Sequence, residues 1–115
     1  NKEPELYIAD RGNNRLEVLS LEMEYKRTVE GVRTPCCLYQ HDGHLYVPEL
    51  GSRVTVIDAK DKIVAQMGDG SGIKDDISKH PGKFKAPHAL TLDSKGNLYV
   101  LEWVPQGRIQ KFNKG

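Results

Sequence analysis

His88 is the residue of this sequence that is best suited to chemistry, and it follows a proline at the start of a predicted strand, Ala86–Leu92. An imidazole that titrates near neutral pH can bind a metal or act as a base. Cys36 stands at the matching place in the segment Thr34–Tyr39, and a cysteine can also bind zinc. A catalytic zinc needs three protein ligands. The two residues therefore predict either part of a metal site or, for His88, a side chain that lines a wet channel and hydrogen-bonds to the backbone.

The second cysteine, Cys37, is expected to be buried, because neighbouring residues of a regular strand point to opposite faces and free cysteine is commonly buried. Cys36 and Cys37 cannot build a disulfide framework, and their spacing matches neither a zinc ribbon nor a redox Cys-x-x-Cys motif. A disulfide between them would force strained local geometry.

Acid–arginine pairs recur along the chain, each across a short turn between two predicted strands. A single pair of this kind suggests catalysis, but its repetition favours a structural salt bridge that ties the turn. The alternative is a ring of arginines that binds an anion. The pairs are Asp10 with Arg15, Glu49 with Arg53, and Glu102 with Arg108.

A loop rim is predicted at the end of the strands where His88 lies. It includes the loops Arg11–Asn14, Leu50–Ser52 and Trp103–Gly107. Trp103 is the only tryptophan, and it either caps the core, which is the favoured interpretation, or anchors a ligand. A glycine-rich insert of mixed charge also falls here, and its Asp69, Asp75 and Asp76 could chelate calcium, although EF-hand spacing is absent. We expect this insert to be a solvated loop, of the length that is often functional or disordered.

The elements that position these residues form a repeat. Three segments read Leu-Tyr-(Ile/Val)-x-(Asp/Glu), and a turn and an alternating strand that begins with arginine follow each of them. The leucine–tyrosine segments are Leu6–Asp10, Leu45–Glu49 and Leu98–Glu102, and the arginine strands are Arg15–Leu19, Arg53–Ile57 and Arg108–Phe112.

Further strands complete a four-stranded antiparallel meander, which predicts an all-β fold. Thr34–Tyr39 and Ala86–Leu92 precede the second and third leucine–tyrosine strands, while Tyr25–Glu30 and Lys62–Met67 follow the first two arginine strands. We call one such four-stranded unit a blade. We expect one domain over residues 1–115, with a partial blade at 6–32, a full blade at 33–70, a loop insert at 71–85 and a partial blade at 86–115.

Leu6–Val18 and Pro87–Glu102 resemble NHL repeats, and the resemblance extends from Leu6 to Phe112. It implies blades of a β-propeller, mostly six-bladed, of which this chain would hold an incomplete ring. A fragment of a longer protein, or a homo-oligomer that completes the propeller, would account for the missing blades.

Pro87-His88 is also similar to strand starts in peptidyl-α-hydroxyglycine amidating lyase-like propellers, where histidines from several blades hold a channel zinc. That resemblance implies His88 as a metal ligand. The position of the second ligand holds Cys36, and the lyase's catalytic tyrosine and arginine have no clear counterpart.

Composition and charge narrow the function classes. With 17 basic and 16 acidic residues the chain lacks the basic surplus that binding to nucleic acid needs, and no apolar run is long enough to span a membrane. We expect a binding or scaffold module for a protein, peptide or glycan. The alternatives are a metal-dependent lyase or hydrolase and a non-functional fragment of a larger secreted enzyme. The sequence leaves the compartment open, and only the resemblance favours an extracytoplasmic one.

Overall fold

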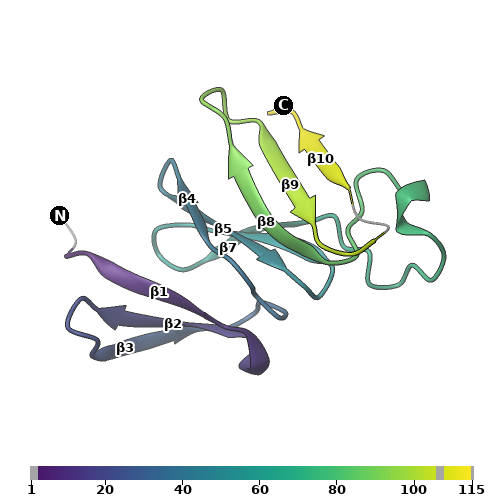
Figure 1. The fold of residues 1–115 in the computed structure, drawn as a ribbon. Helices are drawn as coiled ribbons and strands as arrows, with labels where there is room; N and C mark the ends of the chain where they lie inside the picture. The colour runs from purple at the N-terminus through teal and green to yellow at the C-terminus, as the bar shows by residue number, and fades with distance from the viewer. Residues whose placement is uncertain (1–2, 106–107, 115) are drawn as a thin grey trace.

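The computed structural model describes residues 3–105 and 108–114, and in this part the protein is all-β, with three antiparallel sheets. The expected fold class is thus confirmed at the level of an all-β antiparallel architecture. The first sheet holds β1–β3, the second β4–β7 and the third β8–β10 (Figure 1). The elements are β1 (Glu5–Asp10), the 3-10 turn η1 (Arg11–Asn13), β2 (Arg15–Ser20), β3 (Tyr25–Val29), β4 (Tyr39–His41), β5 (His44–Glu49), β6 (Arg53–Ile57), β7 (Ile63–Met67), the 3-10 turn η2 (Ile77–Lys79), β8 (Pro87–Leu92), β9 (Leu98–Glu102) and β10 (Ile109–Phe112).

The strand that begins with Leu-Tyr pairs with the following arginine strand in one register in all three sheets. The leucine lies opposite the last apolar residue of the arginine strand each time. Corresponding residues of the three sheets therefore occupy corresponding faces, because side chains alternate along a strand. The matching pairs are Leu6 with Leu19, Leu45 with Ile57, and Leu98 with Phe112.

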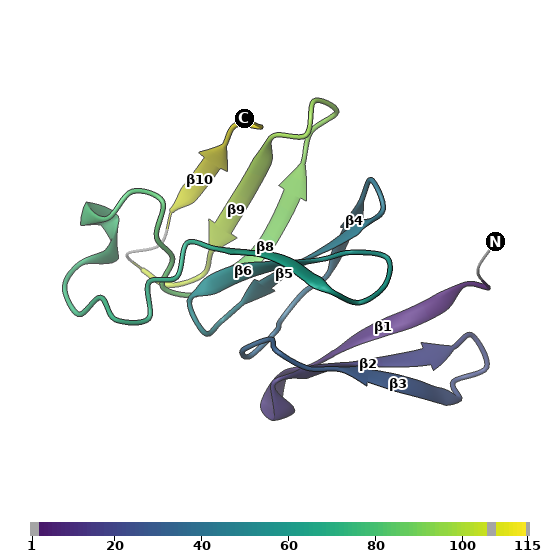
Figure 2. The same ribbon diagram turned by 180° about the vertical axis from the view of Figure 1, so that it is seen from behind.

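The three sheets pack face to face in a row, with the second sheet between the other two (Figures 1 and 2). One buried cluster joins Leu16 and Val18 of β2 to Val47 and Ile57 of the second sheet. Another joins Val54 to residues of the third sheet such as Val100. The stacking extends the molecule to 45 × 33 × 20 Å.

The predicted strand Thr34–Tyr39 is shorter than expected. The regular ladder of β4 begins only at Tyr39, and upstream of it Pro35 forms an isolated bridge with Glu49. Thr34 has a left-handed φ of 45°, which breaks the extended course of the chain. In addition, Pro35 and Pro48 have no N–H to donate, so the ladder between these segments is interrupted.

The insert after β7 is folded, in contrast to the expected solvated loop. Phe84 is fully buried and Ile77 is 2% exposed. Phe84 also forms a parallel bridge with Asp69, which brings the two ends of the insert together. A Cβ added to Gly70 would lie 2.1 Å from the carbonyl oxygen of Phe84, so this closure requires a glycine. The insert therefore extends the core through two apolar side chains, while its charged residues stay at the surface.

Within 3–105 and 108–114, no helix has the length and apolar character that a membrane crossing requires.

Candidate functional site

The rim is the end of the molecule that holds the turns between the leucine–tyrosine and arginine strands. Hydrogen bonds between sheets stabilise the rim. The backbone N–H of Thr34 donates to Asn14 Oδ1 at 2.7 Å, and Ser52 Oγ donates to the Lys85 carbonyl at 2.7 Å. The rim comprises Arg11–Asn14, Leu50–Ser52, Trp103–Pro105, the insert Asp69–Lys85, and Cys36 and His88; Gln106 and Gly107, which were also predicted to belong to it, lie outside the described residues.

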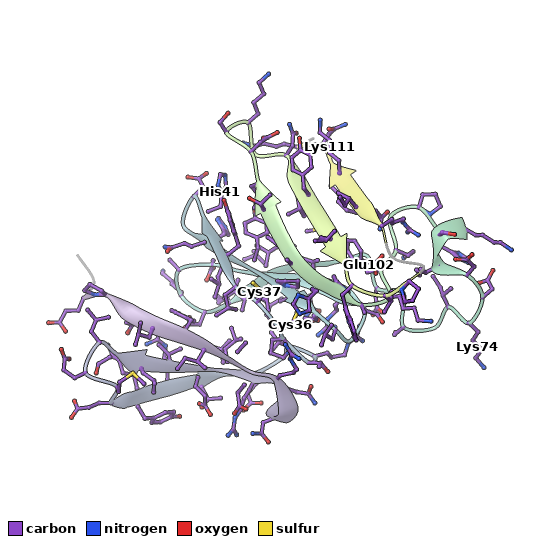
Figure 3. All side chains as sticks on the ribbon, in the orientation of Figure 1. Cys36, Cys37, His41, Lys74, Glu102 and Lys111 are labelled. Atoms are coloured by element: carbon purple, nitrogen blue, oxygen red, sulfur yellow. The ribbon has the colours of Figure 1, made fainter. Side chains whose placement is uncertain are left out.

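Cys36 and His88 come close through the backbone of the third sheet. The thiol of Cys36 lies 3.1 Å from the carbonyl oxygen of His88, and 3.5 Å from the carbonyl oxygens of Pro48 and Pro87. Burial raises the pKa of this thiol to about 11, and the positive charge of Arg11 only partly opposes that shift. Cys36 is thus held as a neutral hydrogen-bond donor between the second and third sheets (Figure 3).

The burial predicted for Cys37 is wrong. Cys37 is exposed and Cys36 is the more buried of the two, and both are free thiols. The prediction assumed a regular strand, but this segment lies before the ladder of β4, where the strict alternation of faces no longer applies.

His88 is exposed on β8, at an irregularity of the pairing between Pro87 and Ala89. Bulges of this kind redirect side chains. Among the described residues, no group of three or more histidine, cysteine, aspartate or glutamate side chains could hold a metal ion. His88 and Cys36 are neighbours at the rim, but the arrangement around them does not supply a third ligand within that part of the chain.

Trp103 is 66% exposed, so the interpretation of this residue as a cap on the core is wrong. The preceding residue, Glu102, is the one that turns into the interior, with 6% exposure. The backbone N–H of Trp103 donates to the Ala86 carbonyl at 3.4 Å, which fixes the start of the loop beside β8. The indole therefore stands in solvent at the rim.

Two of the predicted acid–arginine pairs are present. Arg15 Nε lies 3.0 Å from Asp10 Oδ2, and Arg53 Nε lies 2.5 Å from Glu49 Oε1. Glu49 is fully buried, and its second oxygen accepts a hydrogen bond from Thr55 at 2.7 Å. These contacts tie the turn in each sheet, as a structural role requires.

The predicted pair of Glu102 with Arg108 is wrong. Arg108 donates to three backbone carbonyls of the insert, those of Ile77 at 2.5 Å, His80 at 2.7 Å and Lys83 at 2.8 Å. The folded insert places these carbonyls within reach of the guanidinium, which therefore turns away from its own sheet.

Glu102 is left with backbone partners. Its Oε1 accepts from the N–H groups of Lys85 at 2.5 Å and Ala86 at 2.9 Å. Its Oε2 is buried without a hydrogen-bond partner among the described residues. The insert has therefore changed the partners of an otherwise repeated glutamate.

The carboxylates of the insert are engaged separately. Asp69 Oδ1 lies 3.1 Å from Arg33 Nη2, and this guanidinium holds the pKa of Asp69 well below its usual range. Asp76 accepts from the N–H of Ser78 at 3.0 Å and caps η2, and Asp75 lies 2.8 Å from His80 Nε2. The three carboxylates predicted to chelate calcium thus serve three different local contacts.

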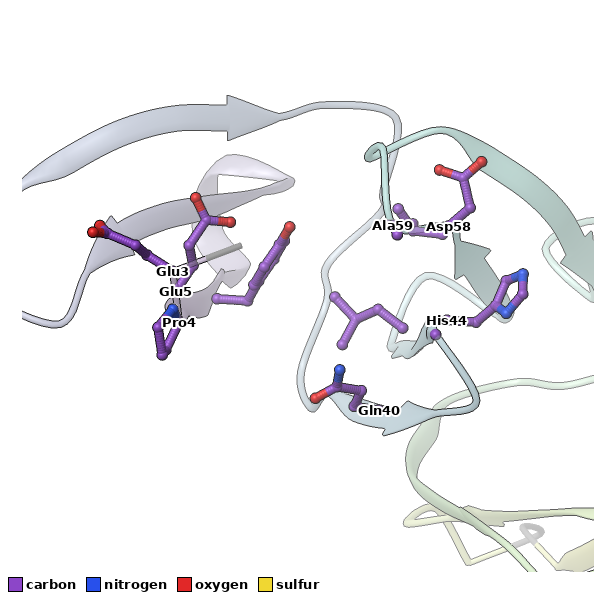
Figure 4. A pocket seen from close by; sticks show the side chains of 11 residues that line it. Glu3, Pro4, Glu5, Gln40, His44, Asp58 and Ala59 are labelled. Carbon is purple, nitrogen blue, oxygen red and sulfur yellow. The ribbon is translucent and has the colours of Figure 1, made fainter. Parts of the chain in front are cut away.

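A hollow lies between the first and second sheets, at the end opposite the rim (Figure 4). Its volume is about 390 Å³, and its lining includes Glu3 and Glu5 from one side and Gln40, His44 and Asp58 from the other. His41 and His44 flank the β4–β5 turn at this end, whereas His88 lies near the start of β8 at the rim, so these histidines do not share a site.

An ion-pair network that the sequence analysis did not anticipate borders this hollow. Arg27 binds both oxygens of Glu5 at 2.9 Å, and its Nε lies 2.5 Å from Asp61 on the second sheet. Tyr7 donates to Asp61 at 2.7 Å. The hydrogen bonds from Arg27 lower the pKa of Glu5 to about 2, while burial and Asp61 raise the pKa of Tyr7 to about 12. No local motif predicts this contact, because Arg27 and Asp61 are 34 positions apart.

No protein-family model matches this sequence, and no curated protein matches it.

Proposed function

We propose that this chain is a section of an NHL-type β-propeller that acts as a binding module, and that its rim takes a protein, peptide or glycan ligand. The observation that carries the proposal is Trp103, a large aromatic side chain that is 66% exposed at the rim. Tryptophan is enriched among the residues that dominate binding energy, because it buries a large area at little cost in conformational entropy.

The common register supports the repeat assignment. Each copy places its leucine–tyrosine strand against its arginine strand with the same pairs of residues in contact. The faces that stack are also equivalent, since β2 packs on the second sheet as β6 packs on the third. A propeller blade is a four-stranded antiparallel sheet that packs on its neighbours. The second sheet has four strands, and the first and third have three each among the described residues.

The chemistry of the rim suits a polar ligand with an apolar or ring-shaped surface. Arg11 and His88 are exposed, and Arg11 is close enough to Cys36 to influence its pKa. These side chains come from the first and third sheets, so a ligand that spans them would contact more than one copy of the repeat. The indole of Trp103 can stack on a sugar ring or an apolar side chain.

A binding screen with matched variants tests this proposal. The wild-type chain and Trp103→Ala would be applied to arrays of immobilised glycans and peptides. Tyr25→Ala is the control, because Tyr25 is 65% exposed but lies on β3 at the start of the strand, away from the rim. We expect wild type and Tyr25→Ala to bind one class of array ligand and Trp103→Ala to lose at least tenfold in affinity. Wild-type protein that binds nothing on either array, or a ligand that Trp103→Ala retains, would refute the proposal.

Fluorescence gives a direct readout because Trp103 is the only tryptophan. Its emission should lie near the maximum of a solvated indole and should shift to shorter wavelength when a ligand selected on the arrays is added. A ligand that binds without changing this emission would lie away from the indole.

Metal analysis separates this proposal from the alternative of a metal-dependent lyase or hydrolase. Zinc bound in a 1:1 ratio to purified protein, and lost in His88→Ala, would favour the lyase. The binding module needs no metal, so its array signal should survive treatment with a chelator.

A further inference from the structure

The two internal interfaces of this protein are built from the same positions of the repeat. The first sheet packs on the second through Tyr7 and Val18, which lie opposite one another, and through Ala9 and Leu16, which do the same. The second sheet turns the matching pairs toward the third. Those pairs are Tyr46 with Val56 and Pro48 with Val54.

The third sheet carries the next set of matching pairs on its outer face, where no described element covers them. The pairs are Tyr99 with Lys111 and Leu101 with Ile109. Leu101 is 47% exposed and Ile109 is 70% exposed, whereas Val54, at the position of Ile109, is fully buried. This outer face, with Ala89 and Thr91 of β8 beside it, forms a shallow apolar hollow of about 310 Å³.

The outer face of the first sheet carries the complementary set. In the second sheet, Leu45, Val47 and Ile57 receive the packing of the first sheet. In the first sheet the same positions hold Leu6, Ile8 and Leu19, and Ile8 is 40% exposed, whereas Val47 is fully buried.

We infer that a second copy of this chain docks head to tail, with the outer face of its first sheet on the outer face of the third sheet. The proposed contact repeats the geometry of the two interfaces inside the chain, because each half presents the residues that already pack in those interfaces. Both halves expose contiguous apolar surface, and a surface of this kind favours contact with a partner that removes it from water. The charges of the two halves are also complementary. Lys111 lies on one half, and the other half carries the carboxylates of Asp10 and Glu17 together with one guanidinium, that of Arg15.

The contact is heterologous, because two different surfaces meet, and this property gives a sharp test. Repeated head-to-tail contacts form a ring if the rotation closes and an open array if it does not. Ile109→Arg damages one half and leaves the other intact, while Ile8→Arg does the reverse. Each variant alone should therefore be a monomer, and their equimolar mixture should stop at one contact between two chains.

Sedimentation equilibrium over a range of concentrations measures these masses. We expect wild type to exceed 12.9 kDa, each single variant to stay at 12.9 kDa and the mixture to reach twice that mass. Val64→Arg is the matched control, since Val64 is 52% exposed on β7 of the middle sheet, and it should associate like wild type. Far-UV circular dichroism verifies the fold, and Ile109→Thr and Ile8→Thr provide β-branched polar replacements at the same positions.

Three results would overturn the inference. They are a wild-type chain that stays monomeric at all concentrations, a mixture of the two arginine variants that stays monomeric, and a Val64→Arg variant that dissociates as they do. A monomer would direct attention to another segment or protein as the occupant of these faces. Rim binding through Trp103 does not depend on this contact, so the two proposals can fail separately.

Discussion

The different partners of Glu49 and Glu102, which occupy equivalent positions, make a prediction that double-mutant cycles can test. Glu49 contacts Arg53 at 2.5 Å, whereas Arg108 donates to carbonyls of the insert and Glu102 accepts from backbone N–H groups. A cycle isolates the energy of one pair from the effects of each residue alone. We therefore expect strong coupling in the second sheet and almost none in the third.

The magnitudes follow from burial. Glu49 is fully buried and the Arg53 side chain is 14% exposed, so removal of one partner leaves a charge without compensation. Breaking such a pair costs about 3–5 kcal/mol, and we expect a coupling energy of about 2–4 kcal/mol between Glu49→Gln and Arg53→Met. For Glu102→Gln and Arg108→Met the coupling should stay within about 0.5 kcal/mol, which is the scatter of independent sites.

Arg108→Met should nevertheless destabilise the protein by itself. It removes hydrogen bonds from a charged donor to three carbonyls, each worth about 1.5–3 kcal/mol when fully shielded from water. Because Arg108 is only partly buried, we expect a total loss of about 2–4 kcal/mol.

Urea unfolding of the four members of each cycle, followed by circular dichroism, gives these energies. Coupling above about 1.5 kcal/mol between Glu102 and Arg108 would mean that the two side chains form an ion pair after all. Coupling near zero between Glu49 and Arg53 would refute the assignment of the buried pair as a stabilising tie.

Three further predictions concern the core, the acid range and the thiols. Phe84→Ala should lower the unfolding free energy by about 3–5 kcal/mol in urea titrations, because the ring is fully buried between the insert and the third sheet; a loss below about 1 kcal/mol would show that the insert is not part of the core. The pKa of Glu5 is lowered to about 2 by its hydrogen bonds from Arg27, so the folded state binds fewer protons than the unfolded state, and stability should fall as the pH decreases from about 4.5 to 2; the urea midpoint should fall less over this range in Arg27→Gln, and an unchanged slope would contradict the network. Iodoacetamide at pH 8 should alkylate exposed Cys37 well before Cys36, whose pKa of about 11 leaves about one thiol in a thousand ionised, and peptide mass spectrometry that finds Cys36 modified first would reject the burial of that thiol.

Local pattern was sufficient to predict most of the strands and two of the short-range ion pairs, although β4 begins only at Tyr39. The turn Asp42-Gly43 adopts positive φ at both residues, 51° and 76°, as a two-residue hairpin turn requires. The pairs of Asp10 with Arg15 and Glu49 with Arg53 form across turns of a few residues, so short sequence spacing places each pair within reach.

Contacts from distant segments decided the rest of the rim. Arg108 occupies the same position as Arg53, but the insert lies within reach of its guanidinium and supplies carbonyl acceptors. Trp103 was expected at the core and stands in solvent, because Glu102 takes the interior position beside Lys85 and Ala86. A sequence pattern does not show which acceptors a folded insert will offer.

The sequence by itself determined most of the alternating strands, their turns and their pairing, because these depend on residues that are close along the chain. Only the tertiary structure decided which side chains are buried and which partner each charge takes. Arg27 reaches Asp61 across two sheets, and Phe84 returns from the insert to fill the core. The physical reason is that burial and ion pairing depend on the surfaces that meet in space, and segments far apart in the sequence contribute those surfaces.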